Sequence, residues 1–263
     1  MTQHLLLGAI IGDTIGSIYE FFPTKDYNFR LLDDRMEYTD DSIMTIAVAQ
    51  WLQEGADTGY PAQLLTRCMR EWGRKYRYPM GGYGGMFTAW LDREDAKPYN
   101  SWGNGSAMRV SSVGLHFATL EETLDAAKAS AEVSHNHPEG IKGAQATAAA
   151  IFLARTGKSK EEIRTYISTT FGYDLNRTCE EIRPTYHFEA SCQETVPQSI
   201  IAFLDSKDFE DAIRLTISLG GDADTMGAIT GAIAAAYYKV IPDNMYQFVW
   251  DKLPDDMKAI INH

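Results

Sequence analysis

The sequence predicts an all-α protein folded as one compact domain. Apolar residues recur at helical spacing along most of its 263 residues, whereas the alternation typical of strands is scarce. Two segments, Thr119–Glu122 and Ser159–Glu162, have the Ser/Thr-x-x-Glu form of a capping box, which marks a helix start. No Ser/Pro-rich linker and no internal repeat divide the chain, so we expect residues 1–263 to form a single domain.

The expected helices follow from this spacing in chain order. Gly8, Gly12 and Gly16 recur every four residues and mark one face of a first helix that another backbone can approach closely. Residues Ile43–Leu52 carry one apolar stripe. The remaining helices are expected at residues 119–131, 141–155, 159–167, 199–204, 209–219, 225–238 and 244–253.

Two long segments interrupt the helical pattern. Pro79–Ser106 is rich in glycine, and Tyr173–Pro197 is polar, contains two prolines and has no helical period. We expect both to be loops, and loops of this length in a compact domain usually carry function or are mobile.

Composition narrows the class of partner and the cellular location. The formal net charge of -12 argues against a nucleic acid or an anionic membrane as the main partner, because both need a basic face. The cysteines, Cys68, Cys179 and Cys192, are odd in number, which fits reduced, buried thiols better than disulfides. The N-terminus lacks the basic region of a secretory signal, and the longest apolar stretch, Ala228–Tyr238, is too short to span a bilayer. We therefore expect a cytoplasmic protein.

Two short acidic segments, Tyr38–Ser42 (YTDDS) and Gly220–Gly227 (GGDADTMG), stand where helices are expected to begin. Taken singly, either can be an ordinary N-cap, because Thr and Asp side chains accept hydrogen bonds there and carboxylates favour the positive end of the helix dipole. Together they supply two threonines and four aspartates, the all-oxygen ligand set that Mg²⁺ prefers. Carboxylates gathered at one site repel one another without cations. We expect the two segments to meet and to bind two divalent ions.

A further acid, Glu20, ends the N-terminal segment Gly8–Glu20 and is flanked by Tyr19, Phe21 and Phe22. A carboxyl group beside aromatic surface can have a raised pKa, which suits a role in proton transfer. The alternative is an ordinary exposed glutamate.

With these motifs, the chain resembles the ADP-ribosylglycohydrolase family, whose members include the dinitrogenase reductase-activating glycohydrolase. The resemblance spans nearly the whole chain and depends on the order and spacing of six motifs. These are Gly8–Glu20, Tyr38–Ser42, Gly81–Gly85, Ser101–Val110, Ser134–Gly143 and Gly220–Gly227. It implies a compact all-helical fold with a binuclear Mg²⁺ centre, or alternatively a Mn²⁺ centre, at the floor of a cleft.

The resemblance implies which residues bind metal and carry catalysis. The implied metal ligands are Thr39, Asp40, Asp41, Asp222, Asp224 and Thr225. Glu20 corresponds to the acidic residue on the family's flexible flap. Together with Asp41 and Asp224, it is expected to act in catalysis.

The resemblance also implies where ADP-ribose binds. The glycine loop does not end in Lys-Ser/Thr and is not a P-loop, so bare backbone N–H groups would meet the pyrophosphate. Trp102 is expected to stack on adenine. His135 matches a family histidine near the ligand, and its alternative is a hydrogen-bonded structural histidine at a helix start. The residues expected to contact ADP-ribose are Gly82, Gly84, Gly85, Ser101, Trp102, Gly103, Asn104 and His135.

The expected function is metal-dependent hydrolysis of the glycosidic bond of ADP-ribosylated substrates, which releases ADP-ribose from a protein side chain or a small molecule. One alternative is a non-catalytic member that binds ADP-ribose, although all the expected ligand carboxylates are present. Another is an all-α magnesium enzyme acting on isoprenyl diphosphates. Such enzymes need a DDxxD spacing, whereas Asp40-Asp41 is followed by Ser-Ile-Met-Thr.

Overall fold

The computed structural model describes residues 3–95 and 97–262 and confirms the all-α prediction. Over this part of the chain the regular structure is helical, with two isolated β-bridges and no strand. The helices are α1 Gln3–Gly16, η1 Ser17–Tyr19, α2 Asp40–Gly55, α3 Ala62–Lys75, α4 Gly85–Asp92, α5 Gly105–Met108, α6 Ser111–His116, α7 Leu120–Glu132, α8 Pro138–Arg155, α9 Lys160–Phe171, α10 Cys179–Ile182, α11 Cys192–Asp205, α12 Phe209–Ile217, α13 Ala223–Tyr238, α14 Asp243–Lys252 and α15 Asp255–Asn262.

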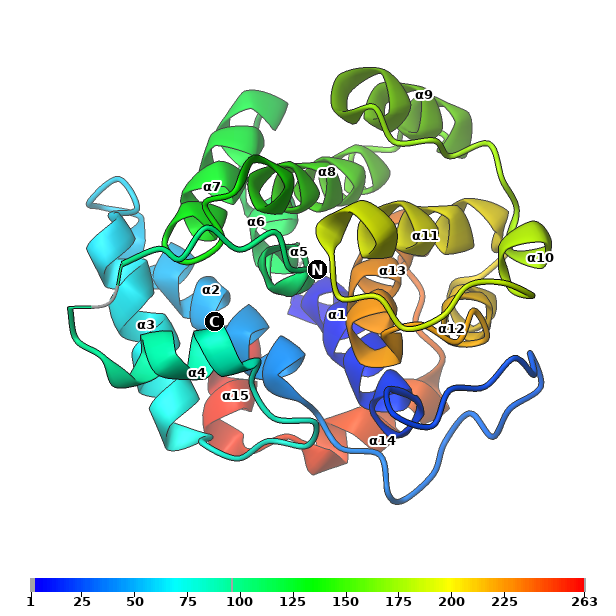
Figure 1. Ribbon diagram of the computed structural model, residues 1–263, viewed down its shortest axis with the longest axis horizontal. Coiled ribbons are helices and arrows are strands. Elements are labelled where there is room, and N and C mark those ends of the chain that lie inside the picture. Colours follow the sequence, from blue (N-terminus) through cyan, green and yellow to red (C-terminus); the bar gives the residue numbers. More distant parts are fainter. Residues whose placement is uncertain (1–2, 96, 263) are drawn as a thin grey trace.

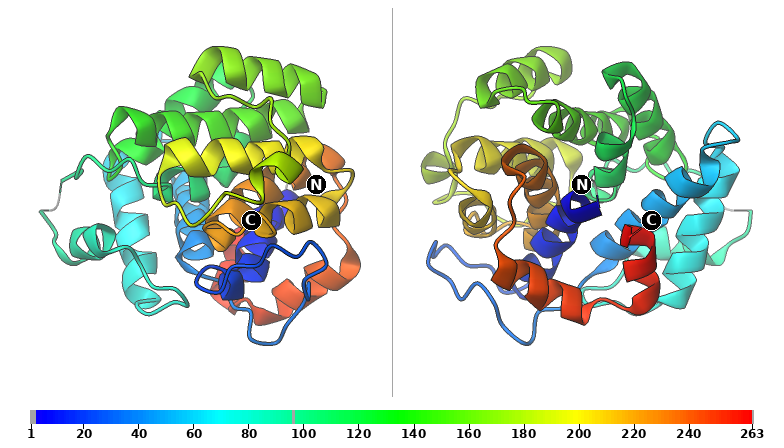
Figure 2. Two further views of the ribbon diagram at one scale, coloured as in Figure 1. Left: turned by 45° about the vertical axis from the view of Figure 1, so that its right-hand side comes forward. Right: turned by 180° about the vertical axis from the view of Figure 1, so that it is seen from behind.

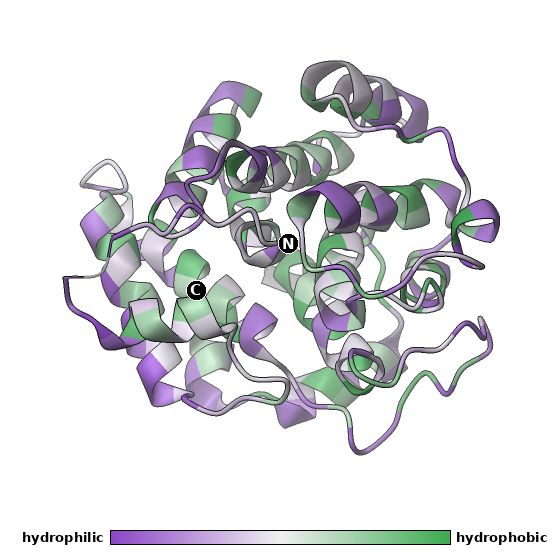
Figure 3. Cartoon of the chain, viewed as in Figure 1, coloured by the Kyte–Doolittle hydropathy of each residue, from purple (hydrophilic) through white to green (hydrophobic). Residues whose placement is uncertain are grey.

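Helices α1 and α13 lie side by side at the centre of the molecule (Figure 1). Helices α8, α11 and α12 pack against α13, while α2 and α3 form a neighbouring pair. Seen from behind in Figure 2, the C-terminal helices α14 and α15 lie against α1 and α2, so the two ends of the chain pack together. Outer helices such as α7 and α9 mix hydrophilic and hydrophobic colour in Figure 3, as amphipathic helices with one exposed face do.

The expected small-residue face of α1 is confirmed and packs directly on the backbone of α13. A Cβ atom added to Gly12 would lie only 1.8 Å from the carbonyl oxygen of Gly227. Gly16 faces Ala223 at the start of α13, whereas Gly8 faces Gly231 further along, so the helices run antiparallel. This contact brings the C-terminal end of α1 to the first turn of α13.

The capping boxes at Thr119 and Ser159 both form, and each opens a helix as predicted. The prediction that residues 79–106 are a loop is wrong in part, because they contain α4. Glycines dominate the local sequence there, but contacts both within the helix and from α3 support it: Trp90 stacks on Phe87, three residues earlier in α4, with ring centroids 5.4 Å apart. The Arg70 guanidinium lies 4.9 Å from the centre of the Trp90 ring.

The second predicted loop, residues 173–197, is also wrong in part. It contains α10, which opens with a third capping box between Thr178 and Glu181. It also contains the first turns of α11, so this helix begins at Cys192 and not at Ser199. Pro197 lies inside the helix and lacks the N–H of an ordinary helical residue. Burial of this part of α11 supports the helix despite that missing donor.

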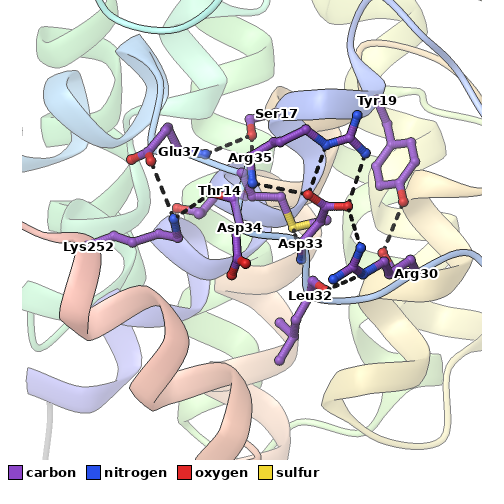
Figure 4. A network of polar contacts seen from close by, with 11 residues as sticks. Thr14, Ser17, Tyr19, Arg30, Leu32, Asp33, Asp34, Arg35, Glu37 and Lys252 are labelled. Carbon is purple, nitrogen blue, oxygen red and sulfur yellow. Dashed lines mark hydrogen bonds and ion pairs between the residues drawn. The ribbon is translucent and has the colours of Figure 1, made fainter.

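The segment between η1 and α2 has no regular structure, yet a compact network holds it in place (Figure 4). Arg35 donates two side-chain hydrogen bonds to the carboxylate of Asp33, at 2.9 and 3.0 Å, and Arg30 forms an ion pair with the same group at 3.2 Å. These contacts hold the pKa of Asp33 well below its usual range. The backbone N–H of Glu37 donates to Ser17 Oγ, which ties the end of the segment back to η1.

Cys68, Cys179 and Cys192 are buried free thiols, as predicted. None of the helices in the described part of the chain has the length and apolarity that a bilayer crossing requires.

Candidate active site

A cavity of about 430 Å³ opens where the first turns of α2 and α13 meet. Its walls carry five carboxyl groups, from Glu20, Asp40, Asp41, Asp222 and Asp224. The two acidic segments, which lie about 180 residues apart in the sequence, therefore share one cavity, as the sequence analysis expected.

The first acidic segment is shaped by the N-cap of α2. Thr39 is the N-cap residue, and its hydroxyl accepts a hydrogen bond from the backbone N–H of Asp41 at 3.2 Å. Asp40 and Asp41 then occupy the first turn, where the helix dipole favours negative charge. Thr39 itself is buried behind the cavity wall, while both aspartates line the cavity.

Asp13 of α1 organises this turn, and the sequence analysis missed its role. Its buried carboxylate accepts hydrogen bonds from the backbone N–H groups of Thr39 and Ser42, each at 3.0 Å. It also accepts from the hydroxyls of both residues, with 2.7 Å to Thr39 Oγ1. Burial raises the pKa of Asp13 to about 6. The sequence did offer one signal for this role, because Asp13 is the only carboxylate within the apolar first helix that carries Gly8, Gly12 and Gly16.

The second acidic segment turns sharply into α13. Gly220 adopts φ +69°, a left-handed conformation that favours glycine. Asp222 is the N-cap residue, but its carboxylate makes no capping bond and instead accepts a hydrogen bond from Asn104 Nδ2 at 2.7 Å. The backbone N–H of Thr225 donates to Asp224 Oδ1 at 2.9 Å. Both aspartates and Thr225 line the cavity.

These carboxyl groups are close enough to disfavour one another's charge. Glu20, Asp222 and Asp224 each offer an oxygen within 4.8 Å of the other two. Burial, with a contribution from Asp224, raises the pKa of Glu20 to about 8. Burial also raises the pKa of Asp222 to about 6 and holds those of Asp40, Asp41 and Asp224 well above their usual range.

The donor atoms of the cluster fit a hard divalent cation. Oδ1 of Asp41 and Oε2 of Glu20 are buried and have no hydrogen-bond partner within the described residues. Carboxylate and hydroxyl oxygens are the ligands that Mg²⁺ and Mn²⁺ take in proteins. A bound cation would offset both the energetic cost of burying negative charge and the repulsion between the carboxylates. The cluster could therefore hold a metal ion.

The glycine loop forms one side of the cavity. Gly82, Gly84 and Gly85 all line it, and a Cβ atom at any of them would meet no other atom within 4 Å, so the space beside them is open. Gly82 has φ +79°, and Gly85 begins α4. A parallel β-bridge between Thr39 and Met80 ties this loop to the first acidic segment.

The segment Ser101–Asn104 is divided between the cavity and the surface. Ser101, Gly103 and Asn104 line the cavity, but Trp102 does not. Its side chain is 54% exposed and its ring contacts that of His137, with centroids 5.6 Å apart. The structure thus does not place Trp102 with the other residues that the resemblance assigned to ADP-ribose.

Asn104 lines the cavity and also makes contacts within the protein that the resemblance did not imply. Its amide nitrogen donates to Asp222 and also to Thr195 Oγ1 at 3.1 Å, so both of its hydrogens are used within the protein. The side chain therefore orients a carboxylate of the cluster. Sequence spacing alone could not show this contact, because Asn104 and Asp222 are 118 residues apart.

His135 lines the cavity, whereas His137 is the N-cap of α8 and accepts from the Glu139 N–H. Nδ1 of His135 lies 2.8 Å from Ser134 Oγ. Arg109 is buried in the same wall and donates to Ser134 Oγ at 2.9 Å.

The mouth of the cavity carries apolar side chains that the sequence analysis did not identify. Phe21, Met86 and Phe188 line the cavity and remain largely exposed. Phe188 comes from the segment that was expected to be a polar loop, and no periodic signal marks it.

The chain thus has an all-α fold with a carboxylate-lined cavity between two helix starts that could hold a divalent cation. The chain belongs to the ADP-ribosylglycohydrolase family, whose sequence model matches residues 3–262. The expectation drawn from the motifs is confirmed at the level of the family.

Individual relatives agree with this assignment. The chain is 27% identical to the ADP-ribosylhydrolase ARH3 of Homo sapiens, over 92% of this chain and 87% of that protein. It is 26% identical to the ADP-ribosylarginine hydrolase Tri1 of Pseudomonas putida, over 89% of this chain and 70% of that protein. A solved structure described as an ADP-ribosylglycohydrolase-related protein complex has the same fold, with a TM-score of 0.77 at 23% identity, over 99% of this chain and 95% of that one.

Proposed function

We propose that this protein hydrolyses the glycosidic bond of ADP-ribosylated substrates, a modified protein or a small molecule, with divalent cations held at the carboxylate cluster. The observation that carries the proposal is the meeting of the first turns of α2 and α13 around one cavity. Membership of the ADP-ribosylglycohydrolase family supports the reaction class, as do the names of ARH3 and Tri1.

The proposed metal ligands come from both helix starts and carry only oxygen donors. They are Thr39, Asp40, Asp41, Asp222, Asp224 and Thr225. Bound Mg²⁺ or Mn²⁺ ions supply Lewis acidity and offset the negative charge of the cluster. Asp13 holds the first set of ligands and Asn104 holds the second, so both sets are fixed by hydrogen bonds before any cation binds.

ADP-ribose is proposed to occupy the rest of the cavity. Gly82, Gly84 and Gly85 leave open space beside backbone N–H groups, which can meet a pyrophosphate without a lysine or arginine. Ser101 and His135 offer further polar groups in the cavity wall. This arrangement lets a chain with a net charge of -12 accept an anionic ligand.

Hydrolysis breaks the bond between the anomeric carbon of the distal ribose and the acceptor atom, and a water oxygen forms the new bond. Glu20 lies at the edge of the cluster, and its free Oε2 is suited to take one proton from that water. Glu20 then returns this proton to the departing acceptor atom, so one water is added across the broken bond and the carboxylate is restored. Asp41 and Asp224 favour the positive charge that develops on the sugar ring in the transition state.

Two substitutions test the assignment of roles. Asp224→Ala should abolish both Mg²⁺ binding and release of ADP-ribose, because it removes a buried oxygen donor at the centre of the cluster. Glu20→Gln should still bind ADP-ribose while its turnover falls. Asp57→Ala, at an exposed residue beyond α2, is the matched control and should behave as the parent protein.

The assay measures ADP-ribose released from arginine-linked, serine-linked and small-molecule conjugates, with Mg²⁺, with Mn²⁺ and with a chelator. Undiminished release by Asp224→Ala in the presence of chelator would refute the scheme. Binding of ADP-ribose without release from any conjugate would identify a non-catalytic binder.

A further inference from the structure

Arg109 is a buried cation without an acidic partner. Its side chain is 1% exposed, and no carboxylate forms an ion pair with it within the described residues. Nη2 donates to the backbone oxygen of Ser130 at 2.8 Å and to Ser134 Oγ at 2.9 Å. A guanidinium group only donates hydrogen bonds, so the direction of both contacts is settled.

The contact with Arg109 determines which way the Ser134 hydroxyl points. Ser134 is fully buried, and its oxygen already accepts from Arg109. Its hydrogen has one acceptor within reach among the described residues, Nδ1 of His135 at 2.8 Å. If Nδ1 carried a proton instead, the serine hydrogen would be buried without an acceptor, at a cost that disfavours this arrangement. Nδ1 therefore accepts, and the ring hydrogen lies on Nε2.

Nε2 of His135 faces the part of the cavity beside two glycines. A Cβ atom on Gly105 would lie 3.0 Å from Nε2, and one on Gly103 would lie 3.7 Å away. No protein group in the described part of the chain accepts a hydrogen bond from Nε2. Burial, with the nearby positive charge of Arg109, holds the pKa of His135 well below its usual range, so the ring is neutral.

We propose that Arg109 is a positioning residue which, through Ser134, fixes His135 as the neutral Nε2–H tautomer. His135 thereby presents one hydrogen-bond donor to an acceptor oxygen of the ligand. The identity of that ligand, a phosphate or ribose oxygen of ADP-ribose, rests on the proposed function. In this arrangement His135 cannot serve as the base that activates water, since its basic nitrogen faces Ser134 and not the cavity.

The tautomer can be read directly by NMR on protein labelled with ¹⁵N-histidine at pH 7. In the parent protein, the His135 signals, assigned by their loss in His135→Gln, should show a protonated Nε2 and an unprotonated Nδ1. Ser134→Ala removes the donor to Nδ1 and should give a mixture of tautomers, whereas Ser134→Thr keeps a hydroxyl and should restore the single form. Arg109→Gln should also give a mixture. A protonated Nδ1 in the parent protein would overturn the proposal, as would a single unchanged tautomer in Ser134→Ala.

Binding of ADP-ribose supplies a second readout. His135→Gln places an amide N–H near the position of Nε2 and should retain affinity within about threefold. His135→Asn reaches only the position of Nδ1 and should bind about tenfold more weakly, the loss expected for one hydrogen bond. Equal affinities for the two variants would contradict the donor role. If the parent protein shows the expected tautomer but does not bind ADP-ribose, the proposed function fails and the tautomer assignment stands.

Discussion

Asn104 Nδ2 lies 2.7 Å from Asp222 Oδ2 and 3.1 Å from Thr195 Oγ1. Because both amide hydrogens are used in these bonds, the Asn104 side chain is fixed and holds the Asp222 carboxylate in one orientation. Residues that orient metal ligands in this way typically change metal affinity when they are replaced, although they do not touch the metal.

Asn104→Ala should therefore weaken Mg²⁺ binding by roughly 10- to 100-fold, measured by titration calorimetry on the purified protein. Thr195→Val is the matched control, because it removes the other partner of the amide and leaves the hydrogen bond to Asp222. Its Mg²⁺ affinity should change little. An Asn104→Ala protein with the parent affinity would show that the hydrogen bond does not orient the ligand.

Asp13→Asn should destabilise the fold through the start of α2. The carboxylate accepts four hydrogen bonds from Thr39 and Ser42, and an amide cannot accept all of them. Three of the bonds end on Oδ2, so with the amide oxygen in that place at least one buried donor, the Thr39 hydroxyl, would lose its acceptor, which corresponds to roughly 1–3 kcal/mol of unfolding free energy. Urea denaturation without divalent ions measures this loss. A change below about 0.5 kcal/mol would show that the network contributes little to stability.

Gly12→Ala should separate α1 from α13. The added Cβ atom would lie 1.8 Å from the Gly227 carbonyl oxygen, a distance that forces the backbones apart. Both stability and Mg²⁺ affinity should fall, because the same contact sets Glu20 beside the first turn of α13. Gly157→Ala, which meets no atom within 4 Å, carries only a backbone cost at φ +86° and should leave Mg²⁺ affinity intact. Parent-like Mg²⁺ affinity in a folded Gly12→Ala protein would disprove this link.

His135 should make stability depend on pH in a defined direction. Burial holds its pKa in the folded protein well below 6.5, whereas the unfolded chain has the ordinary value. Below about pH 6.5 the unfolded state binds a proton that the folded state does not. The free energy of unfolding is therefore unaffected by His135 above that pH and decreases as the pH drops below it. The limiting slope is about 1.4 kcal/mol per pH unit.

His135→Gln should remove this contribution, so its unfolding free energy should fall less steeply between pH 6 and pH 5. The comparison with the parent protein cancels the titration of groups present in both chains, including His116 and the buried carboxyl groups. Identical slopes for the two proteins would mean that His135 takes up a proton in the folded state.

Much of the fold and site was predictable because the signals are local. Helical periodicity identified the central helices, and the glycine spacing in α1 correctly predicted a close helix contact. The two acidic segments were recognisable because each stands at a helix start. Their meeting depends on the antiparallel packing of α1 and α13, which no local pattern encodes.

The features that sequence reasoning missed all depend on tertiary contacts. In α4, which forms among glycines, Trp90 lies against the Arg70 guanidinium of α3, and α11 begins before Pro197 because its first turns are buried. The partners of Asn104 and Asp13 come from distant parts of the chain. In each case the residue type was visible in the sequence, but its partner was not.

The central claim is that oxygen ligands from the starts of α2 and α13 bind divalent cations in one cavity. Its most direct test is a crystal grown with Mn²⁺ and measured near the manganese absorption edge. We expect two anomalous peaks in the cavity, each bordered by carboxylate oxygens from Asp40 or Asp41 and from Asp222 or Asp224. Well-ordered carboxylates with no peak between them, at a Mn²⁺ concentration that supports activity, would contradict it.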